Sequence, residues 1–295
     1  MSTITNTKSL MSKSLVYIIV ALFSIFCLLP FLLIISGSIT EESSIQKFGF
    51  ALIPKKVSFY SYRYLFLDFT KIFNGYKVSM LVTVVGTAVS LMVTALMAYP
   101  LSRRDLKYRN FFSFFAFFTL LFNGGMVPWY ITCTRLGLKD TLIALILPYT
   151  ISAWNMFLLR NYFKSIPDAI HESAKIDGAG ELKTFFSIIF PLSLPGIATV
   201  GLFISLNYWN DWWLGLMLID KDTLFPLQML LRRIVSSAQF FQTPPPGSHI
   251  DASRLMPTEG VKMATCILTI GPIIFVYPYV QKYFVKGIMI GSVKG

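Results

Sequence analysis

Charged residues and cysteines are scarce in this chain. Asp, Glu, Lys and Arg make up 14% of its 295 residues, whereas a soluble domain carries about 25%. The three cysteines are scattered and form no C-x-x-C pair, which excludes a disulfide framework and a cysteine-based zinc site. The two histidines, His171 and His249, are far apart in sequence, and we expect no metal site.

Two energy-coupling features are also missing. The sequence has no G-x-x-x-x-G-K-[ST] motif, so the chain has no P-loop of its own for ATP. The long apolar runs described next carry no Asp, Glu, Lys, Arg or His in their cores, and such groups are the usual mark of a proton relay or ion site. Both absences argue that any energy for transport enters from outside the membrane.

What the chain has in abundance is apolar sequence. Hydrophobic residues make up 55% of it, and its mean hydropathy is +0.63. At 1.5 Å per residue, the first apolar run is about 30 Å long, enough to cross a hydrocarbon core. Each of five further runs falls within the range of about 17–25 residues that a transmembrane helix needs. The expected spans are residues 15–35, 78–100, 111–127, 141–159, 185–206 and 261–279. The predicted fold class is therefore an all-α polytopic membrane protein with about six transmembrane helices.

Basic residues set the expected orientation. The short loop R-R-D-L-K-Y-R at 103–109 lies between the second and third spans, and such loops stay in the cytoplasm. This predicts a cytoplasmic tail at 1–14, a six-span domain at 15–281 and a second cytoplasmic tail at 282–295. The net charge of +12 then reflects anchoring at anionic lipid rather than nucleic-acid binding. The segment 214–260 is expected to be external.

The cytoplasmic loop 160–184 is the best-mixed polar segment of the chain. Pro167 suits the first position of a helix, and Asp168 complements the helix dipole in the first turn. Gly178 after Asp177 predicts the stop, because glycine adopts the left-handed conformation without steric cost. The small, apolar stripe of this helix comprises Ala169, Ile170, Ser173 and Ala174. From the residues alone, a docking helix and an ordinary amphipathic loop helix explain the segment equally well.

Aromatic and amide side chains gather near the outer end of the fifth span, in N-Y-W-N-D-W-W at 207–213. An aromatic belt at the lipid interface explains them structurally. A surface that stacks on sugar rings and hydrogen-bonds their hydroxyls explains them functionally. The candidate substrate-contact residues are Asn155, Asn207, Trp209, Asn210, Asp211 and Trp212.

The loop and the C-terminal tail both resemble segments of a known family. The stretch E-S-A-K-I-D-G-A, followed by F-x-x-I-x-x-P-L-x-x-P from Phe185 to Pro195, resembles the cytoplasmic E-A-A…G motif of bacterial ABC importer permeases. Ser173 replaces the usual second alanine and is still small. The tail K-Y-F-V-K-G-I-M-I-G-S-V-K-G resembles the carbohydrate branch, which includes maltose-type and polysaccharide (lipoprotein-associated) permeases. The motif positions are Glu172, Ser173, Ala174, Asp177, Gly178 and Ala179.

The resemblance implies a transport subunit with no catalytic residue or cofactor of its own. Between spans 4 and 5, a coupling helix is expected to enter a cleft of a separate ATPase, which holds ATP-Mg. Glu172 is then a charged contact, Ala174 permits close approach and Gly178 makes the turn. The further partners implied are a second six-span permease, usually a paralogue, an extracellular solute-binding lipoprotein, membrane lipid and an oligosaccharide or polysaccharide fragment. The implied location is the bacterial cytoplasmic membrane.

Other functions stay open on sequence grounds. The substrate of such an importer could be an amino acid or another non-sugar solute. A membrane enzyme acting on lipid-linked sugar needs paired carboxylates, and Asp211 with Asp220 or Asp222 is the external candidate. An assembly protein that grips a partner through the loop helix is the third alternative.

Overall fold

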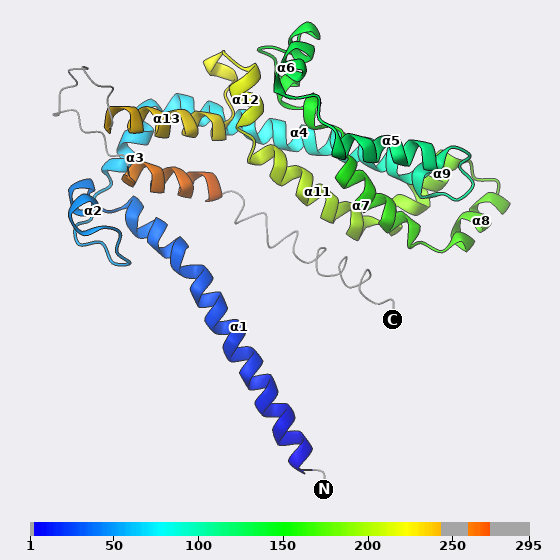
Figure 1. The fold of residues 1–295 in the computed structure, drawn as a ribbon, viewed down its shortest axis with the longest axis horizontal. Helices are drawn as coiled ribbons and strands as arrows, with labels where there is room; N and C mark the ends of the chain where they lie inside the picture. The colour runs from blue at the N-terminus through cyan, green and yellow to red at the C-terminus, as the bar shows by residue number, and fades with distance from the viewer. Residues whose placement is uncertain (1–2, 243–258, 272–295) are drawn as a thin grey trace. The chain divides into compact units, whose positions relative to one another are not determined.

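The computed structural model describes residues 3–242 and 259–271, and its regular elements there are helices (Figure 1). The chain divides into two compact units. One comprises Met1–Phe69 with Arg233–Gly271, and the other is built on Thr70–Arg232. The all-helical fold expected from the sequence is confirmed for the part of the chain that is described.

The first unit contains the long N-terminal helix α1, Thr3–Ser38. Its apolar part, Lys13–Ser38, is long enough to cross a membrane and has no residue of its most apolar window buried, which matches the expected first span. The short helices α2 (Glu42–Phe48) and α3 (Tyr60–Leu65) follow between the first two expected spans. A further helix begins at residue 259 and is described to residue 271.

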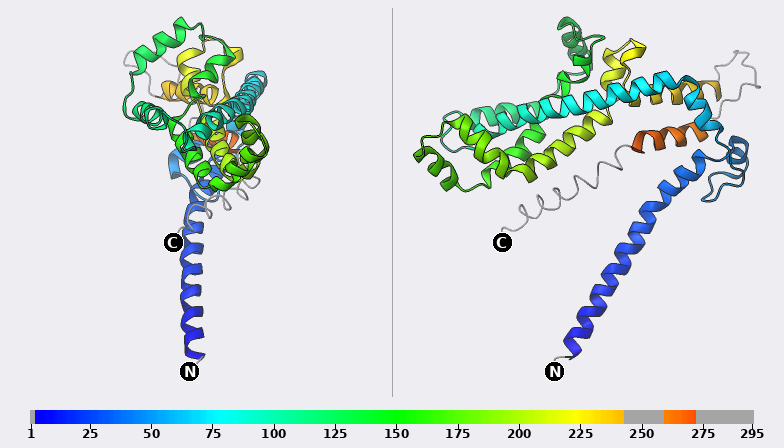
Figure 2. Two further views of the ribbon diagram at one scale, coloured as in Figure 1. Left: turned by 90° about the vertical axis from the view of Figure 1, so that its right-hand side faces the viewer. Right: turned by 180° about the vertical axis from the view of Figure 1, so that it is seen from behind.

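In the second unit, α4 (Phe69–Ser102) is an unbroken 34-residue helix that runs alongside α11 (Leu194–Trp209), as both views in Figure 2 show. A Cβ at Gly86 would lie 2.8 Å from the Tyr208 ring, so only glycine permits this approach. Beside that contact, the Tyr208 hydroxyl and Ser90 Oγ are 2.7 Å apart. Of the small residues in the expected second span that would permit close packing, Gly86, Ser90, Ala95 and Ala98 are buried. This confirms the close packing expected at those four positions, whereas Ala88 is exposed.

The expected third span is broken. Helix α5 (Arg109–Leu121) and helix α6 (Met126–Arg135) meet at 114°. The break lies at Asn123-Gly124-Gly125, where Gly125 has φ +87°, a backbone angle that ends a right-handed helix. The sequence 111–127 is therefore not one continuous helix, and the flexible break that N-G-G predicts near the outer end of this span is confirmed.

The expected fourth span, 141–159, is also interrupted. Two short 3₁₀ turns, η2 (Leu142–Leu145) and η3 (Leu147–Tyr149), precede α7 (Ala153–Lys164) at an angle of 53°. Pro148 lies in η3 and has no N–H for a continuous α-helical ladder. Helix α7 also runs past the expected end of the span, so the first residues assigned to the cytoplasmic loop are helical.

The expected fifth span bends where the sequence placed prolines. Helix α9 (Glu181–Thr184) leads into a π-helical turn, η4 (Phe185–Ile189), and the short helix α10 (Phe190–Leu192). This segment meets α11 at 83°, next to the buried Ser193. Pro191 removes an amide donor, which favours the wider turn before it. Pro195 lies in the first turn of α11 and therefore starts that helix instead of breaking it.

The segment predicted as external contains more helix than expected. Helix α12 spans Trp213–Leu218, and α13 spans Leu227–Gln242. Three parts of the chain lie outside the described residues: the proline-containing stretch 243–248, residues 272–279 of the expected sixth span, and the tail at 282–295. By length and composition, the described residues hold two helices that can span a membrane, or up to five spans if each bent pair is one.

Candidate coupling site

The motif segment forms helix α8, Asp168–Ile176, at one end of the second unit (Figure 1). Asp168 lies in the first turn, as expected, and its Oδ2 is 3.8 Å from Nε of Arg104. Pro167 was expected at the first helical position but is the N-cap, with φ −58° and ψ 136°. Its extended ψ lies outside the α region, so the helix starts one residue later than predicted.

A complete Schellman motif ends α8. The amide of Ala179 donates to the carbonyl of Ala174 at 2.9 Å, and the amide of Gly178 donates to that of Lys175 at 3.1 Å. Gly178 has φ +74°, a conformation that costs residues with a Cβ about 1–2 kcal/mol. A Cβ there would meet no atom within 4 Å. The predicted stop at Gly178 is confirmed, and backbone conformation alone is the reason for glycine.

The two faces of α8 differ. His171 and Ala174 face the chain itself and are 8% and 4% exposed. Glu172, Ser173 and Asp177 are exposed. Ala174 is covered by this chain, so its expected role in permitting close approach of a partner stays a prediction. Its small side chain lets α8 lie close to its own helical bundle.

An aromatic cluster lies beneath the buried face of α8. The rings of His171 and Tyr99 are stacked with centroids 5.9 Å apart, and Tyr99 also contacts Phe185 at 5.1 Å and Phe163 at 6.2 Å. The Tyr99 hydroxyl donates to Oε2 of Glu181 at 2.9 Å. These contacts join α8 to the end of α4, to α7 and to the π-helical turn that begins the bent fifth segment.

Burial sets the charge state of His171. Desolvation lowers its pKa from the ordinary 6.5, and the positive charge of Arg103 lowers it further, while Glu181 and Asp168 oppose the shift. Its Nδ1 is buried, and no hydrogen-bond acceptor or donor in the described part of the chain pairs with it. The ring is therefore neutral at pH 7 and packs against Tyr99 as an apolar group.

A cavity of about 320 Å³ adjoins the cluster between the end of α4 and α9. Its apolar lining comes from Leu96, Pro100, Leu106, Leu182 and the rings of Tyr99 and Phe185. Arg103, Asp105 and Glu181 add charged groups, and the hydrogen bond from Arg103 at 3.1 Å lowers the pKa of Asp105. The side of the cluster that faces α9 is therefore not filled by the described side chains.

The residues predicted for the substrate path have different surroundings, and their role in binding substrate stays a prediction. Asp211 accepts hydrogen bonds from the Tyr149 hydroxyl at 2.9 Å and from the amide of Leu214 at 3.1 Å. It thus anchors the start of α12. Trp209 is buried beside Tyr76, with ring centroids 6.5 Å apart.

The other residues predicted for the substrate path each have different neighbours. The guanidinium of Arg232 lies 3.4 Å from the centroid of the Trp212 ring. Asn207 and Asn210 are exposed, and the Asn210 amide donates to the carbonyl of Leu206 at 2.9 Å. Asn155 donates its backbone amide to Ser152 Oγ at 3.4 Å, at the start of α7.

The candidate carboxylate pairs of an enzyme are not supported by these contacts. Asp211 is occupied by donors of the protein, and Asp220 pairs with Nζ of Lys139 at 2.8 Å.

Three members of the coupling site were not predicted from the sequence: Tyr99, Ile176 and Glu181. Tyr99 and Glu181 lie far from the motif helix in sequence, and no local pattern joins them to His171. Ile176 is 86% exposed at the end of α8. It follows Glu172 by four residues and so shares its helix face, which is a signal that was available in the sequence.

Comparison with known proteins agrees with this geometry. Residues 75–290 match the family described as "Binding-protein-dependent transport system inner membrane component". The chain is 41% identical over 288 residues to the polygalacturonan/rhamnogalacturonan transport system permease protein YtcP of Bacillus subtilis (strain 168), covering 98% of this chain and 100% of that protein. It is also 41% identical over 268 residues to Protein LplC of the same organism, covering 91% and 90%.

A solved structure is similar over almost the whole chain. It is the crystal structure of a bacterial ABC transporter involved in the import of the acidic polysaccharide alginate. The TM-score is 0.78 at 27% identity, and the match covers 94% of this chain and 98% of that one. The family match includes all of α4 to α13 after residue 75, and thus the whole coupling site. The chain therefore belongs to the binding-protein-dependent transport system inner membrane component family, the multi-pass permease subunits of ABC importers.

Proposed function

We propose that this chain forms half of the translocation path of an ATP-driven importer for an oligosaccharide or polysaccharide fragment. The observation that carries the proposal is its 41% identity, over 98% of its length, to a permease named for polygalacturonan and rhamnogalacturonan. The similar solved transporter is described as importing alginate, another acidic polysaccharide. A glycan that contains uronic acid is accordingly the first substrate to test.

The proposed topology has six spans with both termini in the cytoplasm. The two long helices, the three bent pairs and the helix that begins at residue 259 supply six segments. The domain spans residues 15–281, with cytoplasmic tails at 1–14 and 282–295. The external segment 214–260 faces the extracellular solute-binding lipoprotein. A second six-span permease, a paralogue or a copy of this chain, completes the path.

The proposed contact with the ATPase is the exposed face of α8. Glu172 supplies a negative charge, Ser173 and Asp177 supply polar groups, and Ile176 supplies an apolar one. Ala174, Gly178 and Ala179 act indirectly, because they hold the shape of the helix and its terminal turn. The ATPase binds ATP-Mg, and this chain contributes no cofactor.

The proposed movement starts when ATP binding closes the two ATPase subunits. Helix α8 moves as one piece, since its Schellman motif fixes its end and His171 fixes its face. Displacement of α8 pushes the Tyr99 ring and the π-helical turn. The angle between α10 and α11 then changes and access passes from the outside to the inside.

Co-purification tests the docking surface. We expect Glu172→Lys and Ile176→Asp each to lose the ATPase from the gently purified complex, because both lie on the exposed face of α8. Lys183→Glu is the matched control, an exposed charge change on α9. If all three variants retain the ATPase equally, α8 is not the docking element.

Substrate stimulation of ATP hydrolysis tests the rest of the proposal. The intact complex with its binding protein is given oligogalacturonides, neutral malto-oligosaccharides or amino acids in separate assays. Stimulation by a sugar, and by acidic oligosaccharides most strongly, is the expected result. Stimulation by amino acids alone would assign the importer to a non-sugar solute.

A further inference from the structure

Basic side chains converge at the cytoplasmic ends of α4, α5 and α7. Nε of Arg160 donates to the carbonyl of Leu101 at 2.9 Å, and Nη1 of Arg109 lies 3.5 Å from the carbonyl of Arg103. These two carbonyls are two residues apart, so they are within about 7 Å of one another. The guanidinium groups of Arg109 and Arg160 are therefore anchored to the same short backbone segment, and the charge of Arg109 acts on Arg160 as repulsion.

Two more cations join them. Lys164 follows Arg160 by one turn on α7 and thus lies on the same face. The charges of Arg160, Arg109 and Arg104 all act on the Lys164 ammonium as repulsion. We call Arg104, Arg109, Arg160 and Lys164 the basic cluster.

The basic cluster has little internal compensation. Within residues 3–242 and 259–271, no ion pair joins a carboxylate to Arg109, Arg160 or Lys164. Arg104 reaches Asp168 at 3.8 Å, but both side chains are mostly exposed, and such pairs contribute little. Four cations held together without matching acids leave a site of strong positive potential for an anion.

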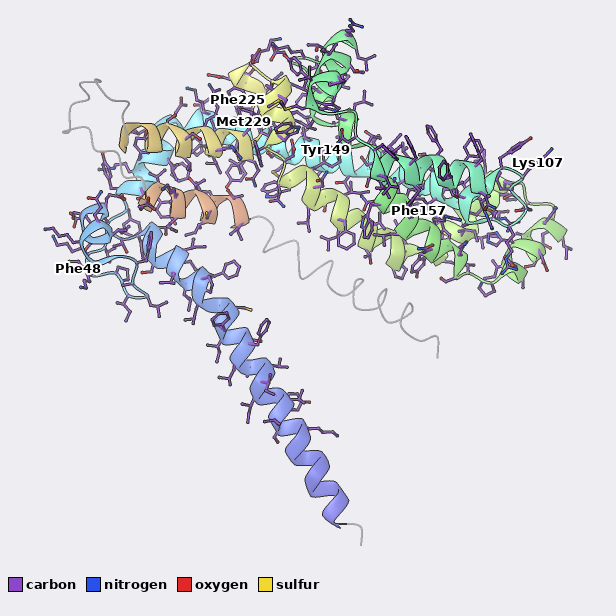
Figure 3. All side chains as sticks on the ribbon, in the orientation of Figure 1. Phe48, Lys107, Tyr149, Phe157, Phe225 and Met229 are labelled. Carbon is purple, nitrogen blue, oxygen red and sulfur yellow. The ribbon has the colours of Figure 1, made fainter. Side chains whose placement is uncertain are left out.

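An apolar surface begins where the basic cluster ends. Arg109 is the first residue of α5, whose 13 residues are all unburied in this chain. Lys107, in the loop before α5, extends from the same end of the unit (Figure 3). The exposed phenylalanines of α5 are Phe111, Phe112, Phe114, Phe115, Phe117 and Phe118. A cationic head directly followed by an apolar, ring-rich stripe along a spanning helix has the dimensions and polarity of one lipid molecule.

We propose that the basic cluster binds the headgroup of an anionic phospholipid of the inner leaflet, with the acyl chains along α5. Paired guanidinium groups match the two free oxygens of a phosphodiester, and Lys164 adds a flexible charge. The adjoining apolar stripe distinguishes this lipid from a free phosphate ion, which is equally anionic but has no apolar part to contact the phenylalanines. The site adjoins the coupling helix, because α7 leads into α8 and Arg104 contacts Asp168.

Retention of phospholipid by the purified full chain tests the proposal. The protein is delipidated in detergent and titrated with phosphatidylglycerol or phosphatidylcholine, and bound lipid is counted by native mass spectrometry. We expect selective binding of phosphatidylglycerol. Lys164→Gln and Arg109→Gln should each weaken it about five-fold, since a basic residue near an anionic surface contributes that much. Lys47→Gln and Lys221→Gln, exposed lysines elsewhere, are the matched controls.

Other outcomes overturn the proposal. Equal loss of phosphatidylglycerol in the control variants, or no loss in the cluster variants, removes the site. Phe114 is exposed on α5. In the variant Phe114→p-benzoyl-phenylalanine, illumination of native membranes cross-links this position to whatever molecule occupies the site. Cross-linking to phospholipid is expected, whereas cross-linking to the second permease alone assigns this face to a protein interface. None of these readouts depends on the transported substrate, so they fail or succeed independently of the proposed function.

Discussion

Replacing Gly178 probes the turn that ends the coupling helix. Its φ of +74° lies where side chains with a Cβ are strained, and no atom lies within 4 Å of the Cβ position. Gly178→Ala should therefore destabilise the turn through backbone strain alone, by about 1–2 kcal/mol. Gly180 is the matched control, because it has φ −70° and equally open space. Gly180 is also the N-cap of α9, where alanine is less favourable than glycine, so this loss opposes the entropic gain of Gly180→Ala and we expect a small net change in stability.

Hydrogen exchange measures this cost locally. The amides of Gly178 and Ala179 are bonded to carbonyls of α8, and they exchange when the turn opens. A loss of about 1–2 kcal/mol raises their exchange rate about 5- to 30-fold in Gly178→Ala. Gly178→Asn should lie between the alanine variant and the parent, since asparagine visits the left-handed region more readily.

Comparing hydrogen exchange in the two alanine variants tests whether the left-handed angle matters. If exchange in Gly178→Ala is no faster than in Gly180→Ala, the left-handed angle does not determine the stability of the turn. For function, we expect Gly178→Val to reach the membrane in normal amounts but to lose substrate-stimulated ATP hydrolysis. Normal uptake by that variant would count against movement of α8 as a rigid piece.

Three further predictions concern packing, charge and a helix cap. Gly86→Ala places a Cβ 2.8 Å from the Tyr208 ring and should destabilise by about 1–3 kcal/mol, seen as a lower Tm in detergent. Ala88→Leu, on the exposed side of α4, should leave Tm unchanged. Because burial lowers the pKa of His171, the unfolded state binds a proton on the imidazole more tightly than the folded state does. The packing of α8 against its own helical bundle should therefore lose stability as pH falls below 6.5. Protease cleavage of the loop should increase accordingly, and His171→Phe should remove that pH dependence. Asp211→Ala removes the anchor of α12 and should cost about 0.5–2 kcal/mol, measured as Tm. An unchanged Tm with lost substrate stimulation would instead assign Asp211 to the substrate.

The ends of α8 could be predicted because their causes are local. Asp168 in the first turn and Gly178 after the last turn act through hydrogen bonds and dihedral angles within a few residues. The direction in which Ala174 points could not be predicted, because it depends on Tyr99 and Phe185 from other helices. A small residue on a helix permits close packing on either side, and sequence does not say which side is occupied.

The spans show the same division between local and distant causes. Hydropathy located α1 and the core of α4 correctly, because apolar length alone sets them. It assigned residues 111–127 and 141–159 to one span each but did not give the bend angles at Gly125 and Pro148, which depend on packing against other helices. Helix α13 went unpredicted. Its apolar residues Leu227, Met229 and Leu231 are mixed with Arg232 and Arg233, and their burial comes from tertiary contacts.

Hydrogen bonds join the bent fifth segment (Glu181–Trp209) to helix α4 at two positions. One joins Tyr99 to Glu181, and the other joins Ser90 to Tyr208. The bend beside Ser193 lies between them in the sequence. Sliding of this segment along α4 would break both contacts, whereas a change of the bend angle needs to break only one of them. We therefore expect the inward and outward states of this permease to differ by a rotation at Ser193 and not by a translation of α11.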